Sequence, residues 1–140
     1  MQQSKLLTRG MPDAGQAAPS HHIVGALTTK NAQALTNAQE CIEHIDSLLQ
    51  KLDVEVIGQL SHSFGSVAEQ SGFTACIGLS ESHIAIHTWP EHGAVELDVY
   101  LCNYLQDNRQ KCRDIFDQIC DYFAPQKVYA DTVKRPAYSL

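Results

Sequence analysis

Apolar residues along the chain follow two different periods, and each period predicts one kind of element. Between residues 35 and 52 they recur at steps of three and four, which predicts one amphipathic helix of about six turns. Asn31 stands where the N-cap of this helix belongs. A shorter stripe over residues 115–123 predicts a second helix, which Pro125 ends. Runs rich in β-branched or alternating residues predict strands over residues 22–29, 54–60, 74–79, 83–89, 94–102 and 127–133.

The order of these elements predicts an α+β fold. The predicted order is strand, helix and strands, followed by strands, helix and strand. This order suits a two-layer sandwich, in which helices cover one face of a mostly antiparallel sheet. In a chain this short the other face of the sheet needs a partner. Residues 1–20 hold Gly and Pro among Gln, Ala and Ser without any apolar period. We therefore expect a mobile N-terminal tail there and a single domain over residues 21–140.

Two of the predicted strands each gather polar residues on one face. Side chains alternate between the two faces of a strand, so the isoleucines of residues 83–89 take one face and both histidines take the other. In residues 94–102 the same alternation puts Cys102 on the face of Glu96 and Asp98. This position favours a polar site for Cys102, although a lone cysteine is more often a small buried residue.

Composition and charge exclude several classes of function. A chain of 140 residues with 44% hydrophobic and 19% charged residues suits one globular domain. Its net charge of −6 lacks the basic footprint of a nucleic-acid-binding protein and disfavours anionic membranes, so we expect neither partner. The sequence has no membrane-length apolar run and no secretory signal, which predicts a cytoplasmic protein. Five cysteines without a CxxC pair favour reduced thiols over disulfides.

The densest group of chemically active residues lies between residues 79 and 93, and three interpretations of it compete. The polar residues can simply belong to a solvent-facing strand. A metal site is disfavoured, because His83 and His87 lie about 13 Å apart on a strand, so we expect no metal. An activated hydrolytic serine at Ser82 has little support, since no G-x-S-x-G turn surrounds it.

A longer pattern changes the balance between these interpretations. Glu81-Ser82-His83, then IHTWPE over residues 86–91, then DVYLC over residues 98–102, closely resemble the bacterial and archaeal S-adenosylmethionine decarboxylases. The resemblance extends over residues 22–133 in element order. It implies a self-cleaving proenzyme, split between Glu81 and Ser82, in which Ser82 becomes the pyruvoyl group that forms a Schiff base with the substrate. No external cofactor is then required.

The same resemblance implies roles for further residues. His87 resembles the base that processes the proenzyme, and Cys102 resembles the donor that returns a proton to the substrate carbon. Thr74 lies where many relatives carry a serine that assists processing, although it can equally well open a strand. Phe64 resembles the aromatic residue that stacks on adenine, and Glu91 resembles the carboxylate that binds the ribose hydroxyls. The resemblance also implies a homodimer of cleaved protomers, packed sheet against sheet in an α/β/β/α arrangement.

The substrate implied by the resemblance is S-adenosylmethionine, whose decarboxylated product serves spermidine biosynthesis. Three features depart from the family pattern beside the expected pocket: Ala26, Ser63 and the long segment from Gly65 to Phe73. Two alternatives are therefore kept. One is a pyruvoyl-dependent decarboxylase of L-ornithine or L-arginine on the same fold, and the other is an unprocessed, noncatalytic regulatory homologue.

Overall fold

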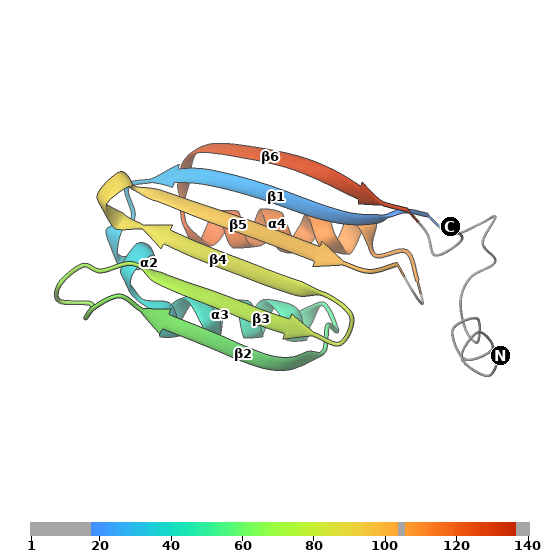
Figure 1. The fold of residues 1–140 in the computed structure, drawn as a ribbon, viewed down its shortest axis with the longest axis horizontal. Coiled ribbons are helices and arrows are strands. Elements are labelled where there is room, and N and C mark those ends of the chain that lie inside the picture. Colours follow the sequence, from blue (N-terminus) through green and yellow to red (C-terminus); the bar gives the residue numbers. More distant parts are fainter. Residues whose placement is uncertain (1–17, 104–105, 137–140) are drawn as a thin grey trace.

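The computed structural model describes residues 18–103 and 106–136, which form one six-stranded sheet with helices packed on one of its faces (Figure 1). Every neighbouring pair of strands is antiparallel, and the strand order is β2-β3-β4-β5-β1-β6. The predicted α+β class and the single helical layer are confirmed. The elements in chain order are β1 (Ser20–Thr29), α2 (Ala32–Thr36), α3 (Ala38–Lys51), β2 (Val56–Ser63), β3 (Phe73–Leu79), β4 (His83–Trp89), the 3-10 turn η1 (Pro90–His92), β5 (Ala94–Leu101), α4 (Arg109–Tyr122) and β6 (Pro125–Arg135).

The long first helix predicted from the apolar stripe is wrong in one respect, because the structure divides it at Asn37. The backbone of Asn37 is not helical, with φ −113° and ψ 89°. Its side chain accepts a hydrogen bond from the backbone N–H of Glu40 at 3.1 Å and so caps α3. The apolar positions keep a helical spacing across this break, which is why periodicity alone did not reveal it.

Several predicted boundaries also shift. The second strand begins later and extends further than residues 54–60. Helix α4 begins at Arg109, earlier than predicted, and the prediction missed this start because the first turn is polar and carries no apolar signal. The predicted tail, residues 1–20, lies outside the described residues except at its end. There Ser20 already belongs to β1, because it pairs with Arg135 of β6. None of the described helices is long and apolar enough to cross a membrane.

The core lies between the helices and the inner face of the sheet. Strand β4 shows the division clearly, because Ile84 and Ile86 are fully buried under the helices while His83 and His87 lie on the opposite face. The buried side chains include three phenylalanines and the apolar stripes of the helices: Phe73, Phe116, Phe123, Cys41, Ile45, Leu49, Ile115 and Ile119. The predicted faces of this strand are thus confirmed.

Close approach of α4 to the sheet depends on a glycine in β1. A Cβ added to Gly25 would lie 2.5 Å from the Phe116 ring and 3.0 Å from the carbonyl oxygen of Tyr129. The ring of Phe116 is itself buried, so it has no free space into which to move. Gly25 therefore sets how closely α4 packs.

The other face of the sheet, which we call the open face, is not covered by any helix of the described residues (Figure 1). It mixes polar side chains with large apolar ones. Leu60 of β2 is 66% exposed, and Trp89 of β4, Tyr129 and Val133 of β6 are also exposed. Such exposed apolar area across several strands is typical of a surface that a partner covers.

Candidate active site

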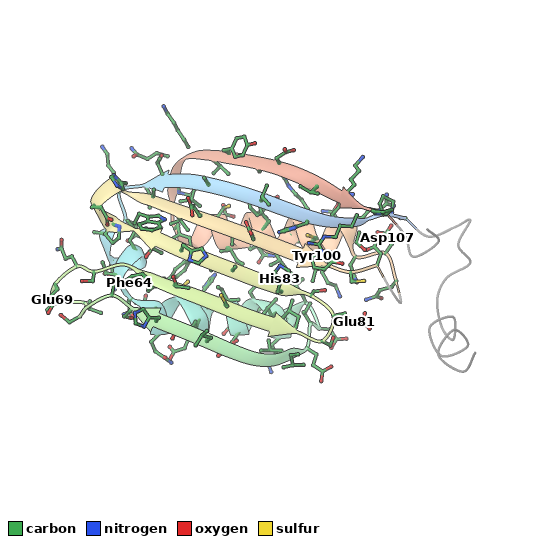
Figure 2. All side chains as sticks on the ribbon, in the orientation of Figure 1. Phe64, Glu69, Glu81, His83, Tyr100 and Asp107 are labelled. Carbon is green, nitrogen blue, oxygen red and sulfur yellow. The ribbon has the colours of Figure 1, made fainter. Side chains whose placement is uncertain are left out.

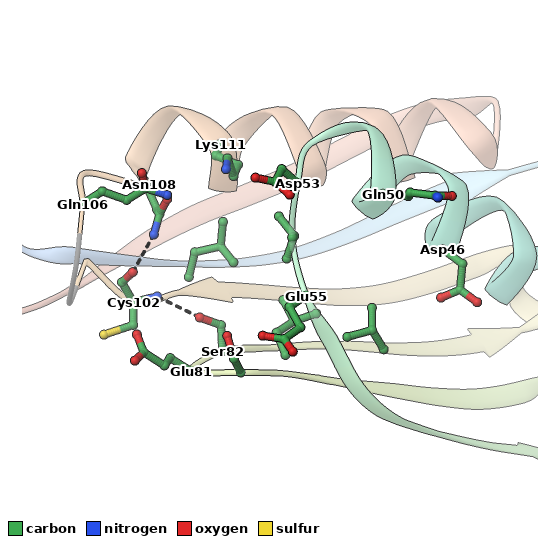
Figure 3. A pocket seen from close by; sticks show the side chains of 15 residues that line it. Asp46, Gln50, Asp53, Glu55, Glu81, Ser82, Cys102, Gln106, Asn108 and Lys111 are labelled. Carbon is green, nitrogen blue, oxygen red and sulfur yellow. Dashed lines mark hydrogen bonds between the residues drawn. The ribbon is translucent and has the colours of Figure 1, made fainter.

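The Glu81–Ser82 bond lies in the tight turn that joins β3 to β4. The backbone N–H of Leu79 donates to the carbonyl oxygen of Ser82 at 2.9 Å, which closes the turn. Glu81 is exposed and Ser82 is partly buried. The Ser82 Oγ accepts a hydrogen bond from the backbone N–H of Cys102 at 2.9 Å (Figure 3). The two residues that the sequence pattern singled out, 20 positions apart, are therefore in direct contact.

A cavity of about 730 Å³ opens beside this contact, between the turn, the end of α3 and the beginning of α4 (Figure 3). Among the described residues that line it, four carry carboxylates and one, Lys111, carries an ammonium group. This charge balance favours a ligand that carries amino or sulfonium groups. The acidic lining residues are Asp46, Asp53, Glu55 and Glu81.

Cys102 follows the last residue of β5 and is 4% exposed. Its carbonyl oxygen accepts a hydrogen bond from Asn108 Nδ2 at 2.8 Å. The sequence places Cys102 on the same strand face as Glu96 and Asp98. Cys102 lines the cavity, whereas neither carboxylate is among the described residues that do, because both lie earlier in β5.

Tyr100 contacts Cys102 from the open face. Burial, then the charge of Cys102 and a side-chain hydrogen bond with it, raise the pKa of the Tyr100 hydroxyl, whereas Arg135 opposes the shift. The Arg135 guanidinium lies 4.2 Å from the centroid of the Tyr100 ring. His83 also packs against this ring, with centroids 5.4 Å apart. The cysteine therefore has a phenol beside it, and a cation lies over the ring of that phenol.

Thr74 and His87 form a second polar pair. They are directly opposite each other on β3 and β4, and Thr74 Oγ1 shares a hydrogen bond with His87 Nδ1 at 2.9 Å. Glu96 of β5 stands opposite His87 on its other side. This pairing fits a histidine whose ring orientation is held by a hydroxyl, as an acid or base requires.

The structure does not bring His87 to Ser82 within one chain. The two residues are five positions apart along an extended strand, which corresponds to about 16 Å at the usual rise per residue. Sheet register confirms the separation, because His83 pairs with Gly78 while His87 pairs with Thr74. The candidate catalytic side chains Ser82 and His87 of one chain therefore lie at opposite ends of β4.

The expected substrate-binding residues lie at the His87 end. Phe64 follows β2, is 64% exposed and meets His62 edge to face with ring centroids 5.0 Å apart. Glu91 lies in η1, directly after β4. Figure 2 shows Phe64 at one end of the sheet and Glu81 at the other. Phe64, Thr74, His87 and Glu91 thus form one group, and Glu81, Ser82 and Cys102 form another.

Sequence reasoning missed several residues around the cavity. Asn108 contacts Cys102, and Lys111 is the only lysine in the described lining. Asp46 joins the lining from α3, where its side chain hydrogen-bonds Gln59. An asparagine before a helix suggests a cap, but nothing in the sequence indicates that its amide reaches Cys102.

The chain is similar in sequence and in fold to known proteins of one family. The family model described as S-adenosylmethionine decarboxylase matches residues 21–136. A protein from Pyrobaculum arsenaticum, named S-adenosylmethionine decarboxylase proenzyme, is 30% identical over 125 residues, which is 89% of this chain and 94% of that protein. One of the same name from Clostridium botulinum (strain Langeland) is 33% identical over 90 residues, 64% of this chain and 74% of the relative.

A solved structure shares the fold. The crystal structure of the adenosylmethionine decarboxylase from Aquifex aeolicus superposes with a TM-score of 0.73 and 24% sequence identity. The match covers 87% of this chain and 94% of the other. The two chains therefore share this fold over nearly their whole lengths.

Proposed function

The chain belongs to the S-adenosylmethionine decarboxylase family, and from this premise we propose that it cleaves itself between Glu81 and Ser82 and then decarboxylates S-adenosylmethionine. The observation that carries the proposal is the contact between Ser82 Oγ and the backbone N–H of Cys102 beside an acidic cavity. The product would be decarboxylated S-adenosylmethionine for spermidine biosynthesis, as the sequence pattern implied.

Self-cleavage uses the position of Ser82 in its turn. The Ser82 Oγ attacks the carbonyl carbon of Glu81, and the peptide nitrogen leaves with a proton, so that an ester replaces the amide. A base then removes the α-proton of Ser82, the Cβ–Oγ bond breaks, and the chain ending at Glu81 departs as a carboxylate. Hydrolysis of the remaining dehydroalanine by water releases ammonia and leaves the pyruvoyl group.

The residues around Ser82 fit a group formed in that place. The turn is at the surface, so the two new chain ends have room to separate, and the buried Cys102 lies directly beside it. When formed, the pyruvoyl group supplies a carbonyl conjugated to an amide, which accepts electrons as carbon dioxide leaves. The Cys102 thiol holds the proton that returns to the substrate carbon, and Tyr100 orients that thiol.

The acidic lining supports a cationic substrate. S-adenosylmethionine carries an ammonium and a sulfonium group, and the carboxylates of Asp46, Asp53 and Glu81 attract both charges. Ornithine and arginine are also cations, so this feature alone does not select between the substrates. Selection for adenine rests on Phe64, whose exposed ring offers a stacking surface.

A second copy of the chain completes the site in this proposal. Ser82 needs a base, yet His87 of the same chain is about 16 Å away. If two open faces pack together about a two-fold axis that runs across the strands, the Ser82 end of one sheet lies over the His87 end of the other. The exposed apolar residues Leu60, Trp89 and Tyr129 on that face support such a contact. The partner's His87 and the partner's Thr74 then serve Ser82.

The test is release of carbon dioxide from carboxyl-labelled S-adenosylmethionine by purified protein, run beside ornithine and arginine, with Ser82→Ala as the blank. Release from S-adenosylmethionine alone is expected. Release from ornithine or arginine instead would reject S-adenosylmethionine as the substrate but would retain pyruvoyl-dependent decarboxylation. Intact mass adds a second readout, because cleavage gives one piece of 81 residues and a second made of the other 59 of the 140. An uncut chain after long incubation would favour a noncatalytic homologue.

A further inference from the structure

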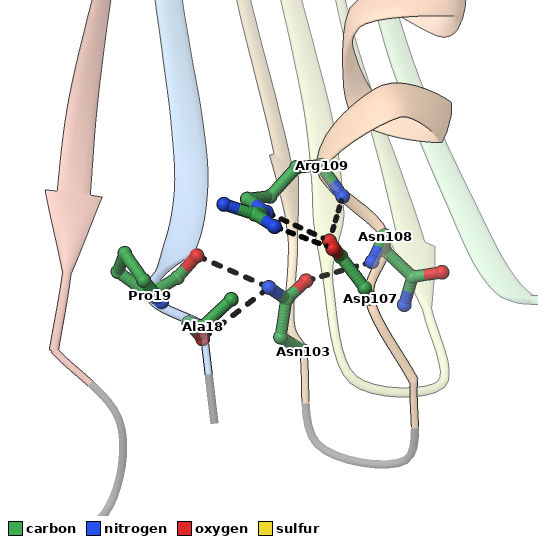
Figure 4. A network of polar contacts seen from close by, with 6 residues as sticks. All are labelled: Ala18, Pro19, Asn103, Asp107, Asn108 and Arg109. Atoms are coloured by element: carbon green, nitrogen blue, oxygen red, sulfur yellow. Dashed lines mark hydrogen bonds and ion pairs between the residues drawn. The ribbon is translucent and has the colours of Figure 1, made fainter. Parts of the chain in front are cut away.

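We propose that Asn108, supported by Asn103, is a positioning residue that holds the backbone of Cys102 so that its N–H points at the Ser82 Oγ. The inference rests on the proposed self-cleavage at Ser82. It adds two amides that neither touch Ser82 nor belong to the sequence pattern. Both lie in the segment between β5 and α4 (Figure 4).

Cys102 needs such support because the sheet no longer holds it. Pairing of β5 with β4 ends at Tyr100, opposite His83, and pairing with β1 ends at Leu101, opposite His21. Beyond these pairs, backbone groups must find partners outside the ladder. The N–H of Cys102 finds Ser82 Oγ at 2.9 Å, and its carbonyl oxygen finds Asn108 Nδ2 at 2.8 Å.

Asn103 ties this segment to the first strand. Its Nδ2 donates to the carbonyl oxygens of Ala18 and Pro19 at 3.3 and 3.1 Å, and its backbone N–H donates to Ser20 Oγ at 2.9 Å. Its Oδ1 accepts from the backbone N–H of Asn108 at 2.9 Å. The Asn103 side chain is thus used as donor and acceptor at once, which an aspartate could not do.

The Asn103 side chain therefore supports Asn108, and the Asn108 side chain supports Cys102. Asn103 is 8% exposed and fixes the backbone of Asn108, while the side chain of Asn108 fixes Cys102 (Figures 3 and 4). The carbonyl oxygen of Cys102 and the N–H of Asn103 share one peptide plane, and that plane is held at both ends, by Asn108 Nδ2 and by Ser20 Oγ. The carbonyl of Cys102 belongs to the following peptide, so the restraint acts through the ψ angle of Cys102 and the position of its α-carbon.

The restraint on Cys102 matters for self-cleavage because the Cys102 N–H contacts the reacting Ser82 Oγ. The Ser82 Oγ is first the nucleophile and later the leaving oxygen, and an N–H directed at it keeps it in one place and stabilises its negative charge when the Cβ–Oγ bond breaks. A misplacement of about 1 Å is enough to slow such a step by roughly 100-fold. Loss of the Asn108 amide should therefore reduce the rate of cleavage without unfolding the protein.

The decisive variant is Asn108→Asp, which keeps the shape of the side chain but removes the donor that holds Cys102. The Asn108 side chain makes no capping hydrogen bond to α4, and a carboxylate before the first turn interacts favourably with the positive end of the helix dipole, so α4 should keep its stability. Asn108→Ala removes the same donor without adding charge. We expect both variants to slow self-cleavage by roughly 10- to 100-fold, with the melting temperature of Asn108→Asp unchanged.

Arg109→Ala is the matched control from the same turn. The Arg109 guanidinium donates to both carboxylate oxygens of Asp107, and Arg109 is not among the described residues that line the cavity (Figure 4). Cleavage of this variant should proceed at the wild-type rate. Cleavage of Asn108→Asp at the wild-type rate, or an equal slowing in Arg109→Ala, would overturn the inference.

A second readout separates this inference from the proposed function. In a Ser82→Ala background, which cannot cleave, iodoacetamide labelling is mapped by mass spectrometry at Cys102, with the fully buried Cys112 as the internal reference. Asn108→Ala should increase labelling of Cys102 several-fold relative to Cys112. Failure of the wild type to cleave would reject the proposed function, whereas unchanged labelling would reject the positioning role.

Discussion

Thr74 and His87 face each other across β3 and β4, with Thr74 Oγ1 and His87 Nδ1 2.9 Å apart, at the opposite end of β4 from Ser82. Residues that one sequence motif joins are thus separated along a rigid strand. A straight strand cannot bend back on itself, so each end of β4 must serve a different site or a different copy of the site. Mutational complementation can distinguish between these.

Variants with a defect at either end of β4 should complement each other. We expect Ser82→Ala and His87→Ala to be inactive alone. When they are co-expressed in equal amounts, mixed dimers contain one site with both Ser82 and the partner's His87. Random pairing then gives about a quarter of the wild-type number of sites. Intact mass and carbon dioxide release measure this, and the absence of any cleaved chain in the mixture would contradict a shared site.

The hydroxyl of Thr74 should matter more than its methyl group. Thr74→Val preserves size but removes the hydrogen bond to His87 Nδ1, whereas Thr74→Ser preserves the bond. We expect Thr74→Val to slow self-cleavage by about 10-fold or more, and Thr74→Ser to cleave normally. A time course of the uncut fraction provides the measurement. Equal rates for the two variants would mean that Thr74 only opens the strand.

Phe64→Ala should weaken binding of S-adenosylmethionine. The ring is 64% exposed and its loss leaves the core untouched, so folding and cleavage should be retained. Stacking of a base on an aromatic ring contributes about 1 to 3 kcal/mol, which corresponds to a rise in KM of roughly 5- to 150-fold. Steady-state kinetics measures KM, and Phe64→Tyr should restore it. An unchanged KM in Phe64→Ala would remove this residue from substrate binding.

The stability of the uncut protein should depend on the protonation of His83. Burial, and then the charges of His22 and Arg135, lower the pKa of His83 below its usual 6.5. The unfolded chain therefore takes up a proton that the folded chain does not, and the free energy of unfolding decreases as the pH falls through 6.5 toward the lowered pKa.

Replacing this histidine should remove that part of the pH dependence. In a Ser82→Ala background, urea unfolding at about pH 7.5 and about pH 5 is compared with and without His83→Gln. The glutamine variant should lose less stability on acidification. Equal losses in the two proteins would assign the acid sensitivity to other groups, such as His21, whose pKa is also lowered by burial.

Gly25→Ala should destabilise the fold. The added methyl group would lie 2.5 Å from the Phe116 ring, which is buried between α4 and the sheet. Overpacking of this kind costs about 1 to 3 kcal/mol. Chemical denaturation measures it, with Gly58→Ala as the control, because a Cβ at Gly58 meets no atom within 4 Å. Equal stability of both variants would show that α4 shifts freely.

Much of the architecture followed from the sequence because its signals are local. Alternation along β4 assigned the isoleucines to the core and the histidines to the open face, since side-chain direction depends only on position along the strand. Apolar periodicity located the helices in the same way. The resemblance of Glu81-Ser82-His83 and of the segments over residues 86–91 and 98–102 to the S-adenosylmethionine decarboxylases indicated the family and the expected cleavage site.

Only the tertiary structure decided which residues meet. The contact between Ser82 and Cys102 depends on how the β3–β4 turn lies against the end of β5, and the pairing of Thr74 with His87 depends on sheet register. The reach of Asn108 to Cys102 depends on where α4 begins. Contacts between segments distant in the chain arise from packing and strand pairing, which local sequence patterns do not encode. Only the folded chain therefore shows that Ser82 and His87 lie at opposite ends of β4.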